Sequence, residues 1–156
     1  MMKNKLFAFL LITLFLTNCE VRKDPVFTGV EQVRLVERSP RSLTFEIQLN
    51  FKNPNLLGGT FSSDDLTVFI NNLELTSLES PLFEVPARDN FTMPILARLD
   101  ASSFKGRELE IISSVLSIAG SQRIQLKLEG DLDYNILGYS SSYRLKYEEN
   151  IELKRN

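Results

Sequence analysis

The side chains of this sequence that could do chemistry are few. Cys19 is the only cysteine, so it has no partner within the chain for a disulfide. The sequence contains no histidine, which removes the commonest general base and the commonest transition-metal ligand. Ser140–Ser142 therefore lack the histidine that activates the serine of a Ser-His-Asp triad. The composition favours a protein without catalytic groups, and Cys19 is the residue whose chemistry can be named.

Four aspartates are candidates for a second kind of site. Asp131 and Asp133 lie two residues apart in an alternating run, so both point to one side of a predicted strand. Such a pair can act as paired carboxylates or as calcium ligands. The alternative, which we favour, is a solvated strand face whose charges discourage edge pairing. Asp64-Asp65 follow two serines and are interpreted as loop or cap residues, so we predict neither a metal nor a cofactor.

The residues before Cys19 have the layout of an export signal. Lys3 and Lys5 precede an apolar run, residues 6–16, which only Thr13 interrupts. A basic start, a short apolar centre and a polar exit are typical of a secretory signal. The run is too short to span a bilayer, which needs about 20 residues.

The end of this segment, Leu16-Thr17-Asn18-Cys19, resembles a bacterial lipobox. The resemblance implies that residues 1–18 are a lipoprotein signal peptide and that Cys19 is acylated and anchors the protein to the cell envelope. Glu20 favours the outer membrane by the same analogy. The acyl groups would supply the two signals that stable anchoring requires. The alternative is ordinary signal cleavage without lipid, because Asn18 stands where a lipobox usually has a small residue.

Charge and length limit the classes of function. Loss of residues 1–18 removes two lysines and leaves 16 Lys and Arg against 20 Asp and Glu, a formal net charge of −4. This mild acidity, without a cluster of basic residues, argues against a nucleic-acid partner. The length suits one domain with its own core. Residues 19–28 are mostly polar and contain Pro25, so we interpret them as a tether and residues 29–156 as the domain.

Alternation of apolar and polar residues predicts a mainly β domain. Residues 43–51 alternate throughout, and residues 124–136 alternate with Gly130 in phase, which marks a bend in a long strand. Pro94 within another alternating run predicts an edge strand or a bulge. Asn71-Asn72 between two apolar runs predicts a tight hairpin. The other strands are expected near 30–37, 66–70, 73–78, 82–85, 91–99 and 143–153, with a loop at 138–142.

One helix is expected among these strands. Its apolar residues have helical spacing and precede Gly120, a suitable C-terminal cap. We expect this stripe to pack against the sheets, and it consists of Leu109, Ile112, Val115, Leu116 and Ala119. The whole pattern predicts an antiparallel β-sandwich of about seven strands with one short α-helix.

The four tyrosines are a possible binding surface for a glycan or a protein. Tyr134, Tyr143 and Tyr147 share the apolar parity of their strands, so we expect them in the core. Tyr139 falls in the predicted loop and is the better surface candidate.

The order of these motifs over residues 26–155 resembles the late embryogenesis abundant group 2 domain, also called the water-stress and hypersensitive-response domain. The resemblance is carried by Asn53-Pro54-Asn55 after an amphipathic strand, by the hairpin, by Glu84-Val85-Pro86-Ala87 and by Gly130. It implies a fibronectin- or immunoglobulin-like sandwich, a role in desiccation or stress tolerance, and no catalytic residues. Asn53, Pro54, Asn55 and Gly130 are expected to be structural.

The sequence therefore predicts a membrane-anchored lipoprotein with a non-catalytic domain that protects the cell envelope against desiccation. The alternative is an envelope adaptor or adhesion module that binds a protein or glycan partner through a loop or an edge strand. Both hypotheses include attachment to the membrane through Cys19 and exclude a nucleic-acid partner.

Overall fold

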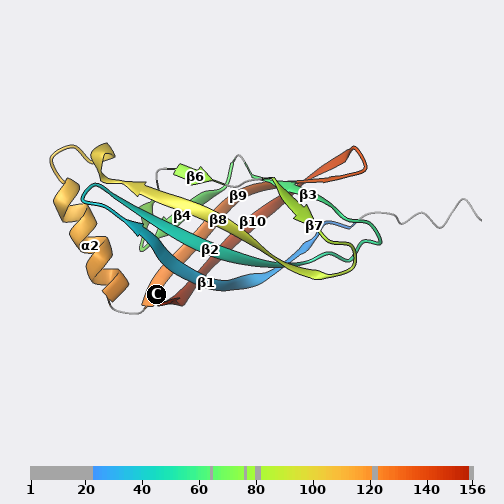
Figure 1. Cartoon of the computed structure of the whole chain (residues 1–156), viewed down its shortest axis with the longest axis horizontal. Coiled ribbons are helices and arrows are strands. Elements are labelled where there is room, and N and C mark those ends of the chain that lie inside the picture. Colours follow the sequence, from blue (N-terminus) through green and yellow to red (C-terminus); the bar gives the residue numbers. More distant parts are fainter. Residues whose placement is uncertain (1–22, 64, 76, 80–81, 121–122, 155–156) are drawn as a thin grey trace, which may run out of the picture.

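The computed structural model describes residues 23–63, 65–75, 77–79, 82–120 and 123–154 (Figure 1). The predicted signal peptide, Cys19 and Asp64 lie outside the described residues. The described chain contains ten strands, one α-helix and a short 3-10 helix. In chain order these are β1 Val26–Arg38, β2 Ser42–Lys52, β3 Gly59–Ser62, β4 Thr67–Ile70, β5 Leu73–Glu74, β6 Ser77–Glu79, β7 Phe83–Val85, β8 Asn90–Asp100, η1 Ala101–Ser103, α2 Glu108–Gly120, β9 Arg123–Ile136 and β10 Tyr139–Lys154.

The strands form two packed sheets that are joined along one side. One sheet contains β1, β2, β8 and β6 in that order, and every neighbouring pair is antiparallel. The other is built on β9, which pairs with β10 on one side and with both β3 and β4 on the other. The sheets join where β1 and β10 pair in parallel, at Val33 with Leu153 and Arg34 with Lys154. The predicted sandwich is confirmed. It has more strands than expected, because β3 was not predicted and the strand predicted at 73–78 is divided into β5 and β6.

The predicted alternation decides which residues form the core. The apolar residues of β2 from Leu43 to Phe51 are almost completely buried, as are those of β8 and β9 on the same parity. Burying one such side chain fully stabilises the fold by about 1.5–3 kcal/mol. At one end of the core, the Phe51 ring contacts Phe27, Phe61 and Phe91 at centroid distances of 5.3, 5.2 and 5.4 Å. These rings support the loops at that end.

Strand β1 does not follow a period of two. Its register with β2 shifts at three places, so the residues facing the core are Phe27, Val30, Val33 and Leu35. Each shift inserts an extra residue, as in a β-bulge. β1 also begins at Val26, so the predicted end of the tether at residue 28 is wrong. The strand starts earlier because the Phe27 ring packs between Phe51 and Tyr147.

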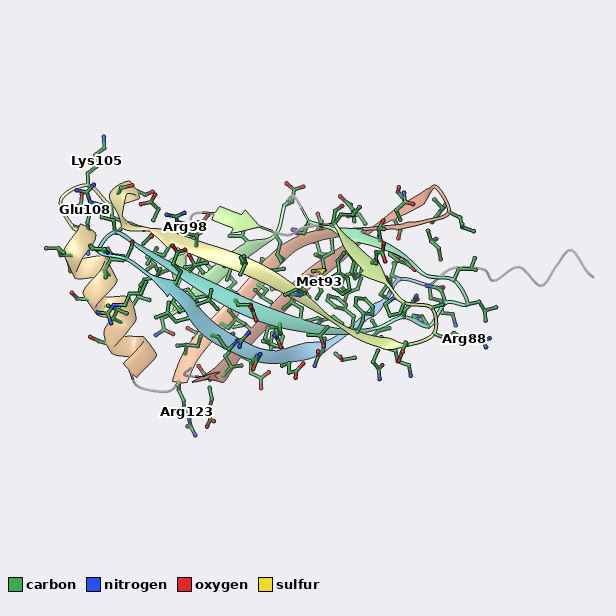
Figure 2. All side chains as sticks on the ribbon, in the orientation of Figure 1. Arg88, Met93, Arg98, Lys105, Glu108 and Arg123 are labelled. Atoms are coloured by element: carbon green, nitrogen blue, oxygen red, sulfur yellow. The ribbon has the colours of Figure 1, made fainter. Side chains whose placement is uncertain are left out.

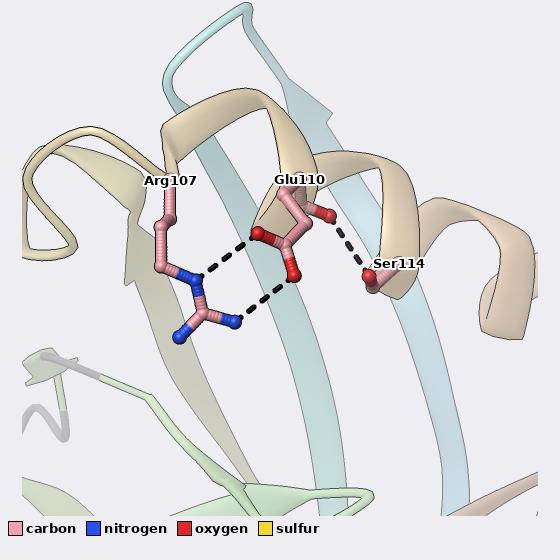
Figure 3. A network of polar contacts seen from close by, with 3 residues as sticks. All are labelled: Arg107, Glu110 and Ser114. Carbon is pink, nitrogen blue, oxygen red and sulfur yellow. Dashed lines mark hydrogen bonds and ion pairs between the residues drawn. The ribbon is translucent and has the colours of Figure 1, made fainter.

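Helix α2 closes one end of the sandwich and does not lie along a sheet (Figure 1). Ile111, Ile112 and Val115 are buried, whereas Leu109 is 75% exposed, so its place in the predicted apolar stripe is wrong. Leu109 lies in the first turn of the helix, where it lines an open depression with Pro40 and Arg41 of the turn between β1 and β2. The Arg107 guanidinium donates two hydrogen bonds of 3.0 Å to Glu110, and the Ser114 hydroxyl donates to the Glu110 carbonyl (Figure 3).

The turns confirm one prediction and correct another. Asn71 and Asn72 form the expected hairpin turn, with φ angles of 48° and 64°. The predicted loop at 138–142 is wrong, because Leu137 and Gly138 alone make the turn and β10 starts at Tyr139. Ser140–Ser142 are strand residues paired with β9. A run of serines on a strand has the composition of a loop, which is why composition alone predicts a loop here.

Pro94 lies in β8 without a bulge, since the register with β2 is unbroken from Asn90 to Asp100. Within the described residues β6 pairs only with residues 96–98, so at Pro94 the strand has a partner on one side alone. This matches the predicted edge position of the proline. No helix in the described part of the chain has the length and apolar character needed to cross a membrane.

Candidate functional site

Asn53 is buried completely at the end of β2, and its side chain joins two loops. Its Nδ2 donates to the carbonyls of Leu57 at 3.1 Å and Pro86 at 2.7 Å. Its Oδ1 accepts from the backbone nitrogen of Asn55 at 3.0 Å and from the Asn55 Nδ2 at 2.9 Å. One amide thus fixes the loop between β2 and β3 against the segment that follows β7.

Asn55 holds the residues through which the chain enters the domain. Its Oδ1 accepts from the Lys23 backbone nitrogen at 2.9 Å, and its Nδ2 donates to the Lys23 carbonyl at 2.6 Å. The amide therefore pairs with both backbone hydrogen-bonding groups of Lys23, as a neighbouring strand would. The Ser141 hydroxyl donates to Asp24 at 2.7 Å, which fixes the next residue to β10. We call this arrangement, from Lys23 through Asn53 and Asn55 to Pro86, the entry junction.

The Tyr134 hydroxyl lies beneath the entry junction. It is buried without a hydrogen bond of good geometry, although the amides of Asn55 and Asn53 lie beside it. Burial raises the pKa of Tyr134 above its ordinary value, and the two amides act in the opposite direction. The ring packs edge to face on Phe61 at 5.3 Å, so Tyr134 is a core residue, as the sequence predicted.

Gly130 leaves room for another part of the chain to cross β9. A Cβ atom at this position would lie against the Asp65 carbonyl oxygen and only 2.6 Å from the Leu66 Cα. Its φ of +149° also disfavours any other residue. β9 pairs with β10 without a register shift through this point, so Gly130 serves the passage of the chain from β3 to β4.

The candidate carboxylates Asp131 and Asp133 lie on β9, and Asp65 lies in the segment that crosses this strand at Gly130. Asp131 makes a 3.4 Å ion pair with Arg144, and Asp133 and Asp65 are exposed. Among the residues that the structure describes, no group of three or more His, Cys, Asp or Glu side chains is arranged to hold a metal.

The other tyrosines divide as expected between surface and core. Tyr139 is exposed, whereas Tyr143 and Tyr147 are partly buried against the core. The Tyr147 hydroxyl donates a hydrogen bond of 2.5 Å to the Glu149 carboxylate. Burial and this contact raise the pKa of Tyr147 to about 12.

The outward side of β1, β2 and β8 is a polar surface, which we call the polar face. Its side chains bond to one another. Arg34 pairs with Glu46 at 2.5 Å, Gln48 donates to the same carboxylate, and Thr92 donates to Asn50 at 2.7 Å. The hydrogen bond from Arg34 holds the pKa of Glu46 below its ordinary value.

The polar face contains an open hollow of about 660 Å³. Its lining consists of Thr28, Glu31, Asn50, Asn90 and Thr92, together with Phe51 and Phe91. The sequence pattern does not predict this hollow. Alternation could have assigned Asn50 and Thr92 to the outward side, but Thr28 and Glu31 are the extra residues of bulges, which leave no periodic signal.

Comparisons with known proteins identify the fold. No protein-family model matches the sequence, and no curated protein matches it. A solved structure from Archaeoglobus fulgidus aligns with a TM-score of 0.54 and 14% identity over 83% of this chain and 98% of that chain. AT1g01470 from Arabidopsis thaliana aligns with a TM-score of 0.53 and 14% identity over 88% of this chain and 87% of its own. At this identity the likeness shows a shared fold alone.

A third structure, from Bacillus subtilis, is described as a candidate lipoprotein. It aligns with 12% identity over 78% of this chain and 35% of its own, with a TM-score of 0.36. An overlap at that level carries no argument for the present chain. The comparisons therefore define a β-sandwich domain that is also found in an archaeal and a plant protein.

Proposed function

We propose that this chain is a lipoprotein anchored to the bacterial cell envelope through Cys19, and that its domain protects the envelope against desiccation without catalysis. The observation that carries the anchoring is the lipobox-like sequence Leu16-Thr17-Asn18-Cys19 at the end of the apolar run. The contact between Asn55 and Lys23 adds the position of the anchor relative to the domain. The amide fixes the start of the domain four residues after the cysteine. Four residues reach at most about 14 Å when extended. An acylated Cys19 would therefore keep the domain next to the membrane surface.

The protective role is supported by the family resemblance and by the polar face. The resemblance rests on Asn53-Pro54-Asn55, which form the entry junction. On the polar face, Arg34, Glu46 and Gln48 hydrogen-bond to one another. Folding normally exchanges bonds to water for bonds within the protein. A surface whose polar groups are already paired loses little when water is withdrawn, which suits a protein that must stay folded during drying.

Anchoring is tested by the intact mass of the protein extracted from membranes. We expect the mass of residues 19–156 increased by a diacylglyceryl group and an N-acyl chain. A Cys19→Ser variant should be recovered without acyl groups and outside the membrane fraction. An unmodified chain beginning at another residue would refute the anchoring.

Protection is tested with a deletion strain exposed to drying, freezing and osmotic shock. We expect lower survival, restored by the native gene and not by Cys19→Ser. The purified protein should also preserve a labile enzyme through drying. Unchanged survival of the deletion strain together with no protection of the enzyme would end the stress hypothesis.

The second candidate is an envelope adaptor that binds a protein or glycan partner. The hollow on the polar face favours it, because Glu31, Asn50 and Thr92 offer acceptors and donors in an open depression. A photo-crosslinking residue at Glu31 should capture a partner in intact cells, whereas the same residue at exposed Ser113 on α2 should not. Recovery of no specific partner from Glu31 would count against this function.

A further inference from the structure

Large apolar side chains gather at the end of the sandwich where the chain enters the domain. Eight such side chains are exposed in the described residues, and five of them lie at this end. Isolated exposed apolar residues are ordinary on a protein surface, whereas a cluster of them marks an interaction site. We call these five residues the apolar end, and they are Val26, Leu56, Leu57, Leu137 and Tyr139.

The fold brings these residues together from three segments. β3 pairs with β9, which places the loop before β3 beside the turn after β9. Gly58 and Leu137 accordingly line the same shallow depression. Figure 1 shows both segments and the start of β1 at the end opposite α2. Figure 2 shows Arg88 at this end and Lys105 and Glu108 at the other.

The entry junction holds the apolar side chains outward. Asn53 binds the carbonyl of Leu57, which fixes that loop from inside. Asn135 accepts a hydrogen bond from Gly138 at 3.2 Å, which fixes the turn that carries Leu137. The aromatic cluster around Phe51 packs in the core beneath this end.

Charged residues of both signs surround the apolar end. Lys23, Lys52 and Arg88 are exposed there, as are the acidic Asp24, Glu84 and Asp89. The three basic side chains can pair with the phosphates of lipid headgroups. Basic residues around apolar tips are typical of surfaces that lie at the boundary between lipid headgroups and acyl chains.

We propose that the apolar end contacts the bilayer and places Leu56, Leu57, Leu137 and Tyr139 among the lipid headgroups. The inference rests on the proposed anchoring at Cys19. The cysteine lies within about 14 Å of Lys23, which the entry junction holds at this same end. The anchor therefore presents this end to the membrane, and α2 and the far end of the sandwich point away from it. The anchored domain has a fixed orientation and does not hang freely on its lipid.

The test uses tryptophan as a reporter, because the native sequence contains none. Leu57→Trp and Leu137→Trp each place one tryptophan at the apolar end. Leu109→Trp is the matched control, since Leu109 is 75% exposed on α2 and Leu137 is 78% exposed. The acylated full chains are reconstituted in vesicles of phosphatidylethanolamine and phosphatidylglycerol, with and without brominated acyl chains.

We expect brominated lipid to quench the emission of Leu57→Trp and Leu137→Trp and to leave Leu109→Trp unchanged. Equal emission from all three variants in both kinds of vesicle would overturn the inference. A blue shift of Leu137→Trp without quenching would also overturn it, because a protein surface would then cover this end. Intact mass of the same samples separates the two proposals. Acylated protein without quenching refutes only the contact, whereas protein without acyl groups refutes the anchoring and the contact with it.

Discussion

Replacement of Asn53 by alanine tests whether the entry junction stabilises the fold. The side chain is buried completely and takes part in four hydrogen bonds, two as donor and two as acceptor. Asn53→Ala leaves the carbonyls of Leu57 and Pro86 and the amide groups of Asn55 without these partners. We expect the variant to be among the most destabilised single substitutions outside the apolar core.

The magnitude follows from the number of bonds. Each hydrogen bond contributes about 1 kcal/mol net, and a buried group left unpaired costs about 1–3 kcal/mol. Allowing for water at the exposed rim of the loop, Asn53→Ala should lower the free energy of unfolding by about 3–5 kcal/mol. That is a large part of the 5–15 kcal/mol typical of a domain. The midpoint of thermal unfolding should fall by roughly 10–20 °C.

Urea denaturation followed by circular dichroism measures this change, because the chain has no tryptophan to report on unfolding. Asn150→Ala is the matched control, since Asn150 is exposed on β10 and its replacement should change the free energy by less than about 0.5 kcal/mol. A loss from Asn53→Ala no larger than the control would refute the structural role of the junction.

Asn53→Asp refines the same test. The carboxylate keeps the two acceptor bonds to Asn55 but faces the carbonyl oxygens of Leu57 and Pro86, where the native side chain donates. Burial and these oxygens would raise the pKa of the new carboxyl in the folded state. Ionisation of this carboxyl then destabilises the fold. The variant should therefore become less stable, relative to the native protein, as the pH rises above the ordinary pKa that the carboxyl has in the unfolded chain.

Two further predictions concern single positions. Gly130→Ala should lower the free energy of unfolding, measured by urea denaturation, by about 3 kcal/mol or more, because the new Cβ meets the backbone of Asp65 and Leu66. Gly29→Ala is the control. Gly29 also has a positive φ but lies in open space, so this change should destabilise the protein less. An equal loss in the two variants would show that backbone strain alone matters. Arg34 lowers the pKa of Glu46 in the folded protein. The pair therefore stabilises the fold fully when the pH is above the pKa of Glu46 in the unfolded chain, near the ordinary value of 4.5. This contribution is lost as the pH falls through the lower pKa of the folded state. Glu46→Gln should lower the free energy of unfolding at pH 7 by about 1 kcal/mol or less. It should also reduce the loss of stability at acid pH, and an unchanged loss at acid pH would contradict the role given to this pair.

The strands that could be predicted are those with one face in the core. β2, β8 and β9 alternate strictly because each buries every second residue. β1 was only approximately located, since its three bulges place core residues two or three positions apart. Leu109 has the spacing of the buried stripe of α2 but is exposed, because spacing alone does not tell which turns of a helix contact the sheets.

The candidate site shows the same division. Asn53 and Asn55 were predicted to be structural from their type, but their partners Lys23 and Pro86 are more than 30 residues away in sequence. Such contacts depend on topology, which a local pattern does not encode. The clearance at Gly130 likewise depends on a crossing by Asp65 and Leu66 that no spacing rule predicts.

The parallel pairing of β1 with β10 has a consequence for the order in which the molecule folds. Val33 and Arg34 lie in the first strand, and their partners Leu153 and Lys154 lie in the last. Contacts between residues so distant in sequence form slowly, because the intervening chain must first be ordered. During synthesis, β1 can pair with β2 early, but the two sheets cannot close until the final strand is present. Loss of the residues around Leu153 should therefore leave both sheets formed and the joint between them open.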